Sequence, residues 1–116
     1  MPEAPYLGEL EHLLLLAILQ LEDEAYTVSI RRVLAAKAHR AVTRGALYTS
    51  LDRLEGRGLV TSRLGEPLAM RGGRPRRYFE VTARGLEALH SARAALANLS
   101  RGMEIPEAAS LRSRRP

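Results

Sequence analysis

The stretch Thr43–Val60, TRGALYTSLDRLEGRGLV, decides the fold that we expect for this chain of 116 residues. Its large apolar residues recur at the spacing of one helical face: Leu47, Leu51 and Leu54. They predict a helix from Arg44 to about Arg57, and Thr43 is a suitable N-cap because its hydroxyl accepts from a first-turn amide. Gly56 and Gly58 are expected to end this helix.

A second helix is expected just before this one. Thr27 is its predicted N-cap, and the helix runs to about Lys37 or His39. Its inner face would begin with Val28 or Ile30 and continue with Val33 and Leu34. Two helices joined by a link as short as residues 40–42 are typical of a helix-turn-helix.

The spacing of apolar residues changes after the helix predicted from Arg44 to about Arg57. Leu59–Leu64 and Arg77–Val81 are rich in residues that favour strands. Between them, Gly65–Arg76 is a long, basic loop with three glycines and two prolines. A helix-turn-helix followed by a β-hairpin is the winged-helix arrangement. The expected fold class is therefore mainly α with a small β-hairpin (α+β).

The two flanking helices predict a dimer. The first, Leu7–Glu22, has more than one apolar face, so it is either a central core helix or the surface that a second subunit covers. The last helix is capped by Thr82 and has a near-heptad apolar series that Arg93 interrupts. The expected interface residues are Leu13, Leu16, Leu86, Leu89, Leu96, Leu99 and Met103. We expect a winged-helix domain at residues 1–81, with its first helix also in the interface, a dimerisation helix at 82–103 and a flexible basic tail at 104–116.

The charge of the chain is distributed unevenly. Residues 1–30 have six acids and no Lys or Arg, whereas residues 31–84 have thirteen bases against four acids. Residues 85–116 have five bases against three acids, and the whole chain has a net charge of +5. All the bases except Lys37 are arginines, which suit phosphates and guanine edges. The middle of the chain is therefore where we expect a polyanion to bind.

The sequence offers little for catalysis. There is no Cys, and His12, His39 and His90 belong to three different predicted elements. No serine has the context of a nucleophile elbow, so we expect no catalytic residue, no metal site and no cofactor. The longest apolar run, Leu13–Leu19, is too short to span a membrane. We expect a soluble cytoplasmic protein that acts at the nucleoid and has no membrane partner.

Several motifs, in their order and spacing, resemble the PadR-type winged-helix transcriptional regulators. They are Gly45-Ala46-Leu47-Tyr48, Arg53-Leu54-Glu55, Gly58-Leu59-Val60, Arg71-Gly72-Gly73-Arg74-Pro75-Arg76-Arg77-Tyr78-Phe79, and Thr82 with Gly85. The resemblance covers about residues 7–100. Ala25 and Thr49 depart from it, because the family usually has Gly and often Pro there. The resemblance implies a homodimeric repressor whose last helix contacts the first and last helices of its partner. It also implies a small-molecule effector in many members.

The exposed face of the helix after Thr43 is the predicted reading surface. The expected DNA-binding residues are Thr43, Arg44, Gly45, Tyr48, Thr49, Arg53, Arg71, Arg74 and Arg76. Thr49 and Arg53 are the candidates for base edges, and the arginines of the basic loop suit a minor groove. Tyr48 either reaches a phosphate or packs on the first helix. Asp52 either accepts from a cytosine amino group or pairs with an arginine.

These observations predict a sequence-specific regulator, acting as a repressor that binds an inverted-repeat operator in double-stranded DNA as a homodimer. The alternative is a winged-helix module that binds protein or RNA without operator specificity. An effector is possible, but some family members stack flat aromatic ligands between tryptophans, and this chain has no Trp. We therefore expect no open pore for planar aromatic molecules.

Overall fold

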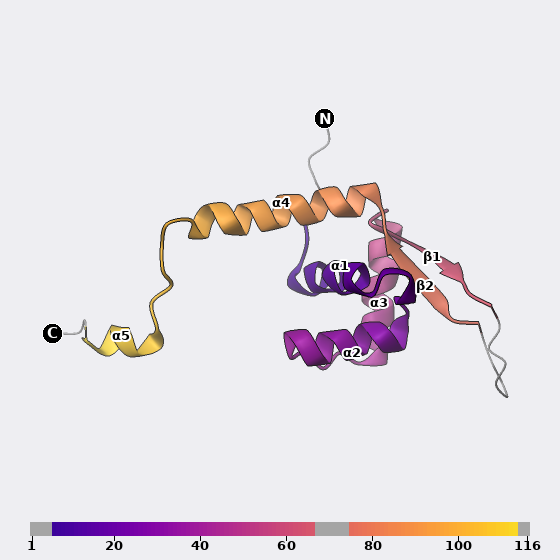
Figure 1. Cartoon of the computed structure of the whole chain (residues 1–116), viewed down its shortest axis with the longest axis horizontal. Coiled ribbons are helices and arrows are strands. Elements are labelled where there is room, and N and C mark those ends of the chain that lie inside the picture. The colour runs from indigo at the N-terminus through magenta and orange to yellow at the C-terminus, as the bar shows by residue number, and fades with distance from the viewer. Residues whose placement is uncertain (1–5, 67–74, 114–116) are drawn as a thin grey trace.

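The computed structural model describes residues 6–66 and 75–113. In chain order the elements are α1 (Glu9–Leu21), the 3-10 turn η1 (Glu22–Glu24), α2 (Thr27–Ala38), α3 (Arg44–Gly56), β1 (Val60–Leu64), β2 (Arg77–Val81), α4 (Ala83–Ser100) and α5 (Ala108–Ser113). Helices α1, α2 and α3 form a head from which the β1–β2 hairpin projects, while α4 crosses the head and extends beyond it (Figure 1). This arrangement confirms the expected winged-helix fold class.

The core of the head lies where α1, α2, α3 and the hairpin meet. Leu47, Leu51 and Leu54 are completely buried, which confirms the predicted inner face of α3. Every residue buried in the described part of the chain is apolar, apart from Gly85 at the start of α4. Since burial of one leucine side chain contributes about 1.5–3 kcal/mol, this three-leucine face holds α3 firmly against the head.

Helix α1 is the central core helix of the head. It begins two residues later than predicted, because the N–H of Gly8 donates to the carboxylate of Glu11 at 2.9 Å and closes the first turn. It ends before Glu22, whose φ of 53° leaves the helical region. Leu13 and Leu16 are half-buried against the core. Of the two predicted alternatives for this helix, a central core helix and a surface that a second subunit covers, the first therefore describes its place within the single chain.

The start of α2 differs from the prediction. Tyr26, rather than Thr27, is the N-cap. The reason is the side chain of Ser29, whose Oγ accepts from the N–H of Tyr26 at 3.0 Å and completes the first turn one residue earlier. On the inner face, Ile30 is buried together with Leu34, whereas the alternative, Val28, is 41 % exposed.

The hairpin forms an antiparallel pair that runs from Val60 opposite Val81 to Leu64 opposite Arg77. Its first strand begins after Leu59, one residue later than predicted, because the N–H of Leu59 still donates to the last turn of α3. A third segment borders the second strand, since the N–H of Phe79 donates to the carbonyl of Ala25 at 2.8 Å. The hairpin is thus attached to the head along both of its sides.

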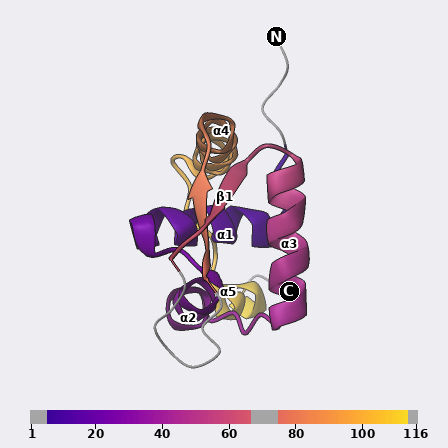
Figure 2. The ribbon, with the colours of Figure 1, turned by 90° about the vertical axis from the view of Figure 1, so that its right-hand side faces the viewer.

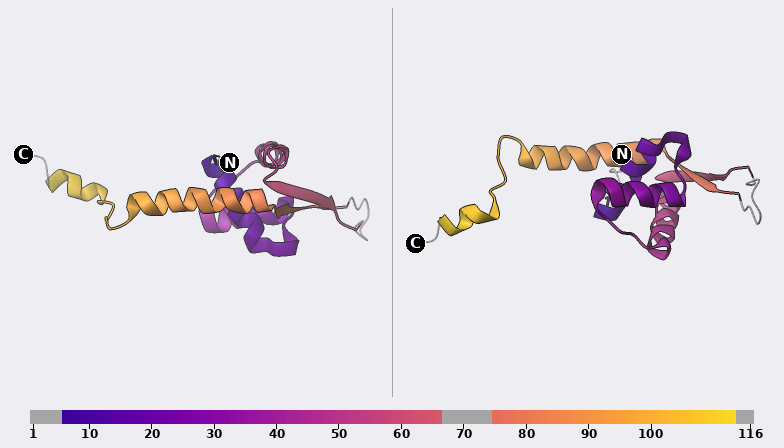
Figure 3. Two further views of the ribbon diagram at one scale, coloured as in Figure 1. Left: turned by 90° about the horizontal axis from the view of Figure 1, so that it is seen from above. Right: turned by 60° about the horizontal axis from the view of Figure 1, so that its bottom comes forward.

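Only the first half of α4 packs on the head. Thr82 caps this helix as predicted, because its hydroxyl accepts from the N–H of Gly85 at 3.0 Å. Gly85, Ala88 and Leu89 are buried, but every residue from Arg93 to Ser100 is exposed. Figure 3 shows this second half extending away from the head.

The end of α4 corrects two expectations. Met103 was expected at the end of the helix capped by Thr82, but it lies outside α4. The backbone becomes extended at Arg101, and Gly102 adopts a φ of 74°. The segment after it, expected to be a flexible basic tail, contains the short helix α5, which begins after Pro106. Figure 1 shows α5 far from the helical head.

Candidate nucleic-acid interface

The outer face of α3 is small and polar. Gly45, Thr49, Asp52, Arg53 and Gly56 are all exposed on it, opposite the buried leucines. Nothing lies within 4 Å of the position that a Cβ would take at either glycine. Figure 2 shows α3 at the flank of the head, with no other element on its outer side in that view. A helix with such a face can approach the floor of a DNA major groove.

The N-terminal end of α3 has groups that favour a negatively charged ligand. Thr43 is the N-cap that the sequence predicts, since its Oγ1 accepts from the N–H of Ala46 at 3.1 Å. The link before it is held by Arg31 of α2, whose Nε donates to the carbonyl of Val42 at 3.0 Å. The amides of the first turn and the positive end of the helix dipole point outward here, and Arg44 adds a full charge. An anion such as a phosphate would be favoured at this position.

Asp52 and Tyr48 of this helix each had two predicted alternatives, and the structure gives an observation on each residue. Asp52 forms an ion pair with Arg77 at 3.5 Å, so the arginine partner is present in the chain itself. Tyr48 is 42 % exposed. Its side chain is therefore not buried against α1.

Arg77 connects the hairpin to α3 in a way that the sequence does not reveal. Its Nε donates to Ser62 Oγ on β1 at 3.0 Å, and a terminal nitrogen contacts the carboxylate of Glu55 on α3. Ser62 in turn donates to Glu55 at 2.8 Å. These residues are 7 to 22 positions apart along the chain. No periodicity pairs them, so only the folded arrangement shows the connection.

The predicted contacts of the basic loop are only partly described. Arg71 and Arg74 lie outside the described residues. The guanidinium of Arg76 lies 4.2 Å from the centre of the Tyr26 ring, a cation–π contact. A hydrogen bond to Tyr78 raises the pKa of Arg76, which therefore stays charged at any physiological pH. Arg76 thus contributes positive charge at the base of the loop and also attaches the loop to the head.

A second set of contacts joins the end of α3 to α1 and α4. Arg57, the C-cap of α3, donates to the Glu11 carboxylate on α1 at 2.6 Å, while its carbonyl accepts from Arg84 on α4 at 3.2 Å. Thr82 also donates to the carbonyl of Gly58 at 2.6 Å. Burial alone would raise the pKa of Glu11, but the hydrogen bonds from Arg57 and a backbone amide outweigh burial and lower it. The carboxylate is thus ionised at neutral pH and fixes the orientation of α3.

The residues predicted to contact a second subunit fall into three groups. Leu13 and Leu16 are half-buried within the head. Leu89 is only 4 % exposed because it lies in the core of its own chain, so little of its surface is available to a partner. The others are exposed to the following extents: Leu86 39 %, Leu96 62 %, Leu99 81 % and Met103 57 %.

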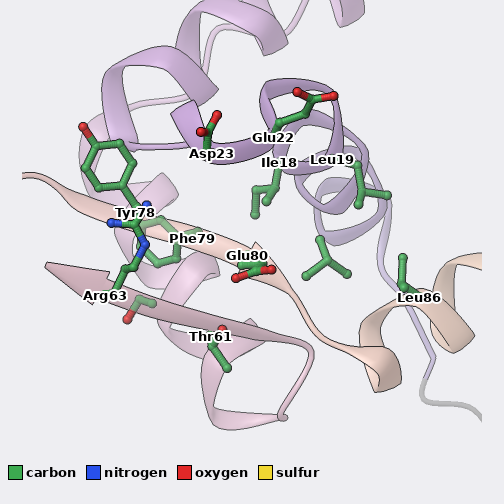
Figure 4. A pocket seen from close by; sticks show the side chains of 12 residues that line it. Ile18, Leu19, Glu22, Asp23, Thr61, Arg63, Tyr78, Phe79, Glu80 and Leu86 are labelled. Carbon is green, nitrogen blue, oxygen red and sulfur yellow. The ribbon is translucent and has the colours of Figure 1, made fainter. Parts of the chain in front are cut away.

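A pocket of about 520 Å³ lies between the end of α1, the hairpin and the start of α4 (Figure 4). Apolar side chains such as Leu19 and Leu86 line it, together with three carboxylates, Glu22, Asp23 and Glu80, and one base, Arg63. Carboxylates repel a polyanion, so this pocket does not belong to a nucleic-acid interface.

No group of three or more His, Cys, Asp or Glu side chains that could hold a metal ion is found among residues 6–66 and 75–113. Over the same ranges, no helix is both long and apolar enough to cross a membrane.

The comparisons with known proteins agree with this geometry. The pattern of the transcriptional regulator PadR-like family matches residues 15–91. A PadR-like transcription factor from Bacteroides fragilis is similar in structure, with 31% identity, a TM-score of 0.63 and coverage of 80% of this chain and 84% of that one.

Two further solved structures have the same fold. A PadR family regulator from Eggerthella lenta shows 28% identity and a TM-score of 0.61 over 92% of this chain and 88% of its own. A PadR family regulator from Clostridium difficile shows 21% identity and a TM-score of 0.67 over 81% of this chain and 93% of its own. A comparison with curated proteins finds no match. The chain therefore belongs to the PadR-like family of transcriptional regulators.

Proposed function

We propose that this DNA-binding regulator is a repressor that binds an inverted-repeat operator as a homodimer. The observation that carries the proposal is the outer face of α3, which is small, polar and exposed while three leucines fix its inner face in the core. A dimer with two-fold symmetry presents two such helices, and its operator has the matching symmetry. Occupation of the operator would block transcription sterically.

Each part of the head has a distinct role in this proposal. Thr49 and Arg53 contact base edges from the exposed face of α3. Thr43, Arg44 and the backbone at Gly45 bind phosphates at the beginning of that helix, and Tyr48 reaches a phosphate from its flank. Arg71, Arg74 and Arg76 bring positive charge to the minor groove.

The homodimer is supported by the exposed half of α4. Leu96 and Leu99 continue the face by which the first half of the helix packs on its own head. They line a groove of about 550 Å³ with Leu7 and Ala92. His12 also lines this groove; burial, together with the charge of Arg93, lowers its pKa, so its imidazole is neutral at pH 7. A second copy of the chain would cover this apolar surface.

Fluorescence anisotropy with duplexes from the DNA that flanks the gene tests the proposal. We expect one duplex to bind far more tightly than random DNA, with affinity that falls steeply as salt rises. Arg53→Ala should cost about 1–3 kcal/mol on this operator and little on random DNA. Arg74→Ala should weaken both complexes and reduce the salt slope by about one. Equal affinity for all duplexes, or displacement by unrelated RNA, would contradict operator recognition.

Sedimentation tests the homodimer separately. Leu96→Glu should convert the dimer into a monomer and abolish operator binding, because one half-site alone binds weakly. Val28→Glu is the matched control, since Val28 is an exposed apolar residue on α2. A stable monomer of the unaltered chain at micromolar concentration would contradict the dimer. Transcription in vitro, with and without the protein, distinguishes a repressor from an activator.

A further inference from the structure

Arg77 is the first residue of β2, at the loop end of the β1–β2 hairpin (the wing), and every contact of its guanidinium points back into the protein. Nε donates to Ser62 Oγ at 3.0 Å, one terminal nitrogen contacts Glu55, and the other lies 3.5 Å from Asp52. The guanidinium carbon also lies 5.2 Å from the centre of the Phe79 ring. A planar guanidinium with all three nitrogens engaged is fixed in one orientation.

Arg77 and its partners form a closed network across three elements, β2, β1 and α3. Ser62 accepts from Arg77 and donates to Glu55 Oε2 at 2.8 Å, so its hydroxyl links β1 to α3. Both oxygens of Glu55 are used, one by Ser62 and the other by Arg77. Hydrogen bonds in such a network orient one another, and the loss of one member leaves the others without partners.

The charge of this network argues against a phosphate contact. One guanidinium faces two carboxylates, those of Glu55 and Asp52, so the group has a net negative charge. A phosphate gains little from approaching a cation that two carboxylates already neutralise. Arg77 therefore differs in role from Arg71, Arg74 and Arg76, the arginines proposed to bring positive charge to the minor groove.

We propose that Arg77 is a positioning residue that holds the wing at a defined orientation relative to α3. The inference rests on the proposed DNA-binding function, which it deepens. An isolated two-stranded hairpin has little stability of its own, so its direction depends on attachments to the head. With the wing fixed, the contacts of α3 and of the wing meet one DNA site together, and binding does not have to order the wing.

The test compares Arg77→Met with two matched variants. Methionine keeps much of the apolar stem but removes the charge and the hydrogen bonds. We expect affinity for the operator to fall about tenfold, affinity for random duplex to change less than about twofold, and the salt slope to stay the same. Arg63→Met removes the same charge from the adjacent strand, where the guanidinium lies over the Tyr78 ring, and should preserve specificity. Arg77→Lys, which keeps the charge without the planar fork, should restore specificity only in part.

Glu55→Gln provides an independent test from the other end of the network. It should reproduce the loss of specificity, and in the Arg77→Met background it should have no further effect. A salt slope reduced by about one in Arg77→Met, with equal losses on both duplexes, would show a phosphate contact and overturn the inference. Unchanged specificity in both variants, measured where circular dichroism shows them folded, would also overturn it. Failure of the unaltered chain to bind any duplex would overturn the proposed function, and this inference with it.

Discussion

Gly45→Ala should make the free protein more stable and its DNA complex weaker. Gly45 is the second residue of α3 and is exposed, and no atom lies within 4 Å of where the new Cβ would stand. The methyl group therefore meets no obstacle in the free protein. In the proposed complex the same position lies against the DNA, where Gly allows the backbone amides to approach a phosphate.

The two effects have opposite signs and different sizes. Replacing an exposed helical glycine with alanine stabilises a protein by about 0.4–1 kcal/mol, because the unfolded chain loses freedom. A methyl group that holds the first turn away from the DNA removes a hydrogen bond to a charged group, which contributes about 1.5–3 kcal/mol. That loss corresponds to a decrease in operator affinity of about 10- to 140-fold.

Denaturant unfolding and fluorescence anisotropy measure the two effects on one preparation. Gly56→Ala is the matched control, because Gly56 is also exposed and its added Cβ would likewise have no atom within 4 Å. It lies about 16 Å further along α3, at the far end of the helix from the predicted phosphate contacts. The control should gain similar stability and keep its DNA affinity. If Gly45→Ala binds the operator as tightly as the unaltered chain, α3 does not approach DNA through this turn.

Three further outcomes are expected. Gly85→Ala should lower the free energy of unfolding by about 1–3 kcal/mol in a denaturant titration, because its Cβ would lie 2.2 Å from the carbonyl oxygen of Leu59; an unchanged midpoint would contradict this close packing. Because the folded pKa of Glu11 is lowered, its stabilisation is present above the unfolded value of 4.5 and is lost as pH falls through the folded pKa. Glu11→Gln should therefore flatten the decline in unfolding free energy below pH 4.5. Calorimetric titration with planar aromatic dyes should show no submicromolar site in the dimer, because α1 and α4 contain no Phe, Trp or Tyr; tight binding at one site per dimer would refute this.

The sequence was sufficient for features that depend on neighbours in the chain. The leucine spacing in α3, the caps at Thr43 and Thr82, and the second strand were all predictable, and the structure confirms them. Where two neighbouring side chains could both cap a helix, the sequence did not show which of them does. At the start of α2, Thr27 and Ser29 each have a hydroxyl group that can close the first turn. The structure shows that Ser29 closes it, so the N-cap is Tyr26, one residue earlier than the predicted N-cap Thr27.

Only the tertiary structure decided which surfaces remain exposed and which distant side chains meet. Leu89 and Leu96 have the same place in a heptad pattern, yet one lies in the core and the other is 62 % exposed, because the head ends beneath the middle of α4. Likewise, Arg77 finds Glu55 and Ser62 only after β2 pairs with β1 beside α3. Helix and strand periodicity reflects interactions over a few residues and is visible in the sequence. The meeting of residues on separate elements depends on how the elements pack, and that is set by the whole core at once.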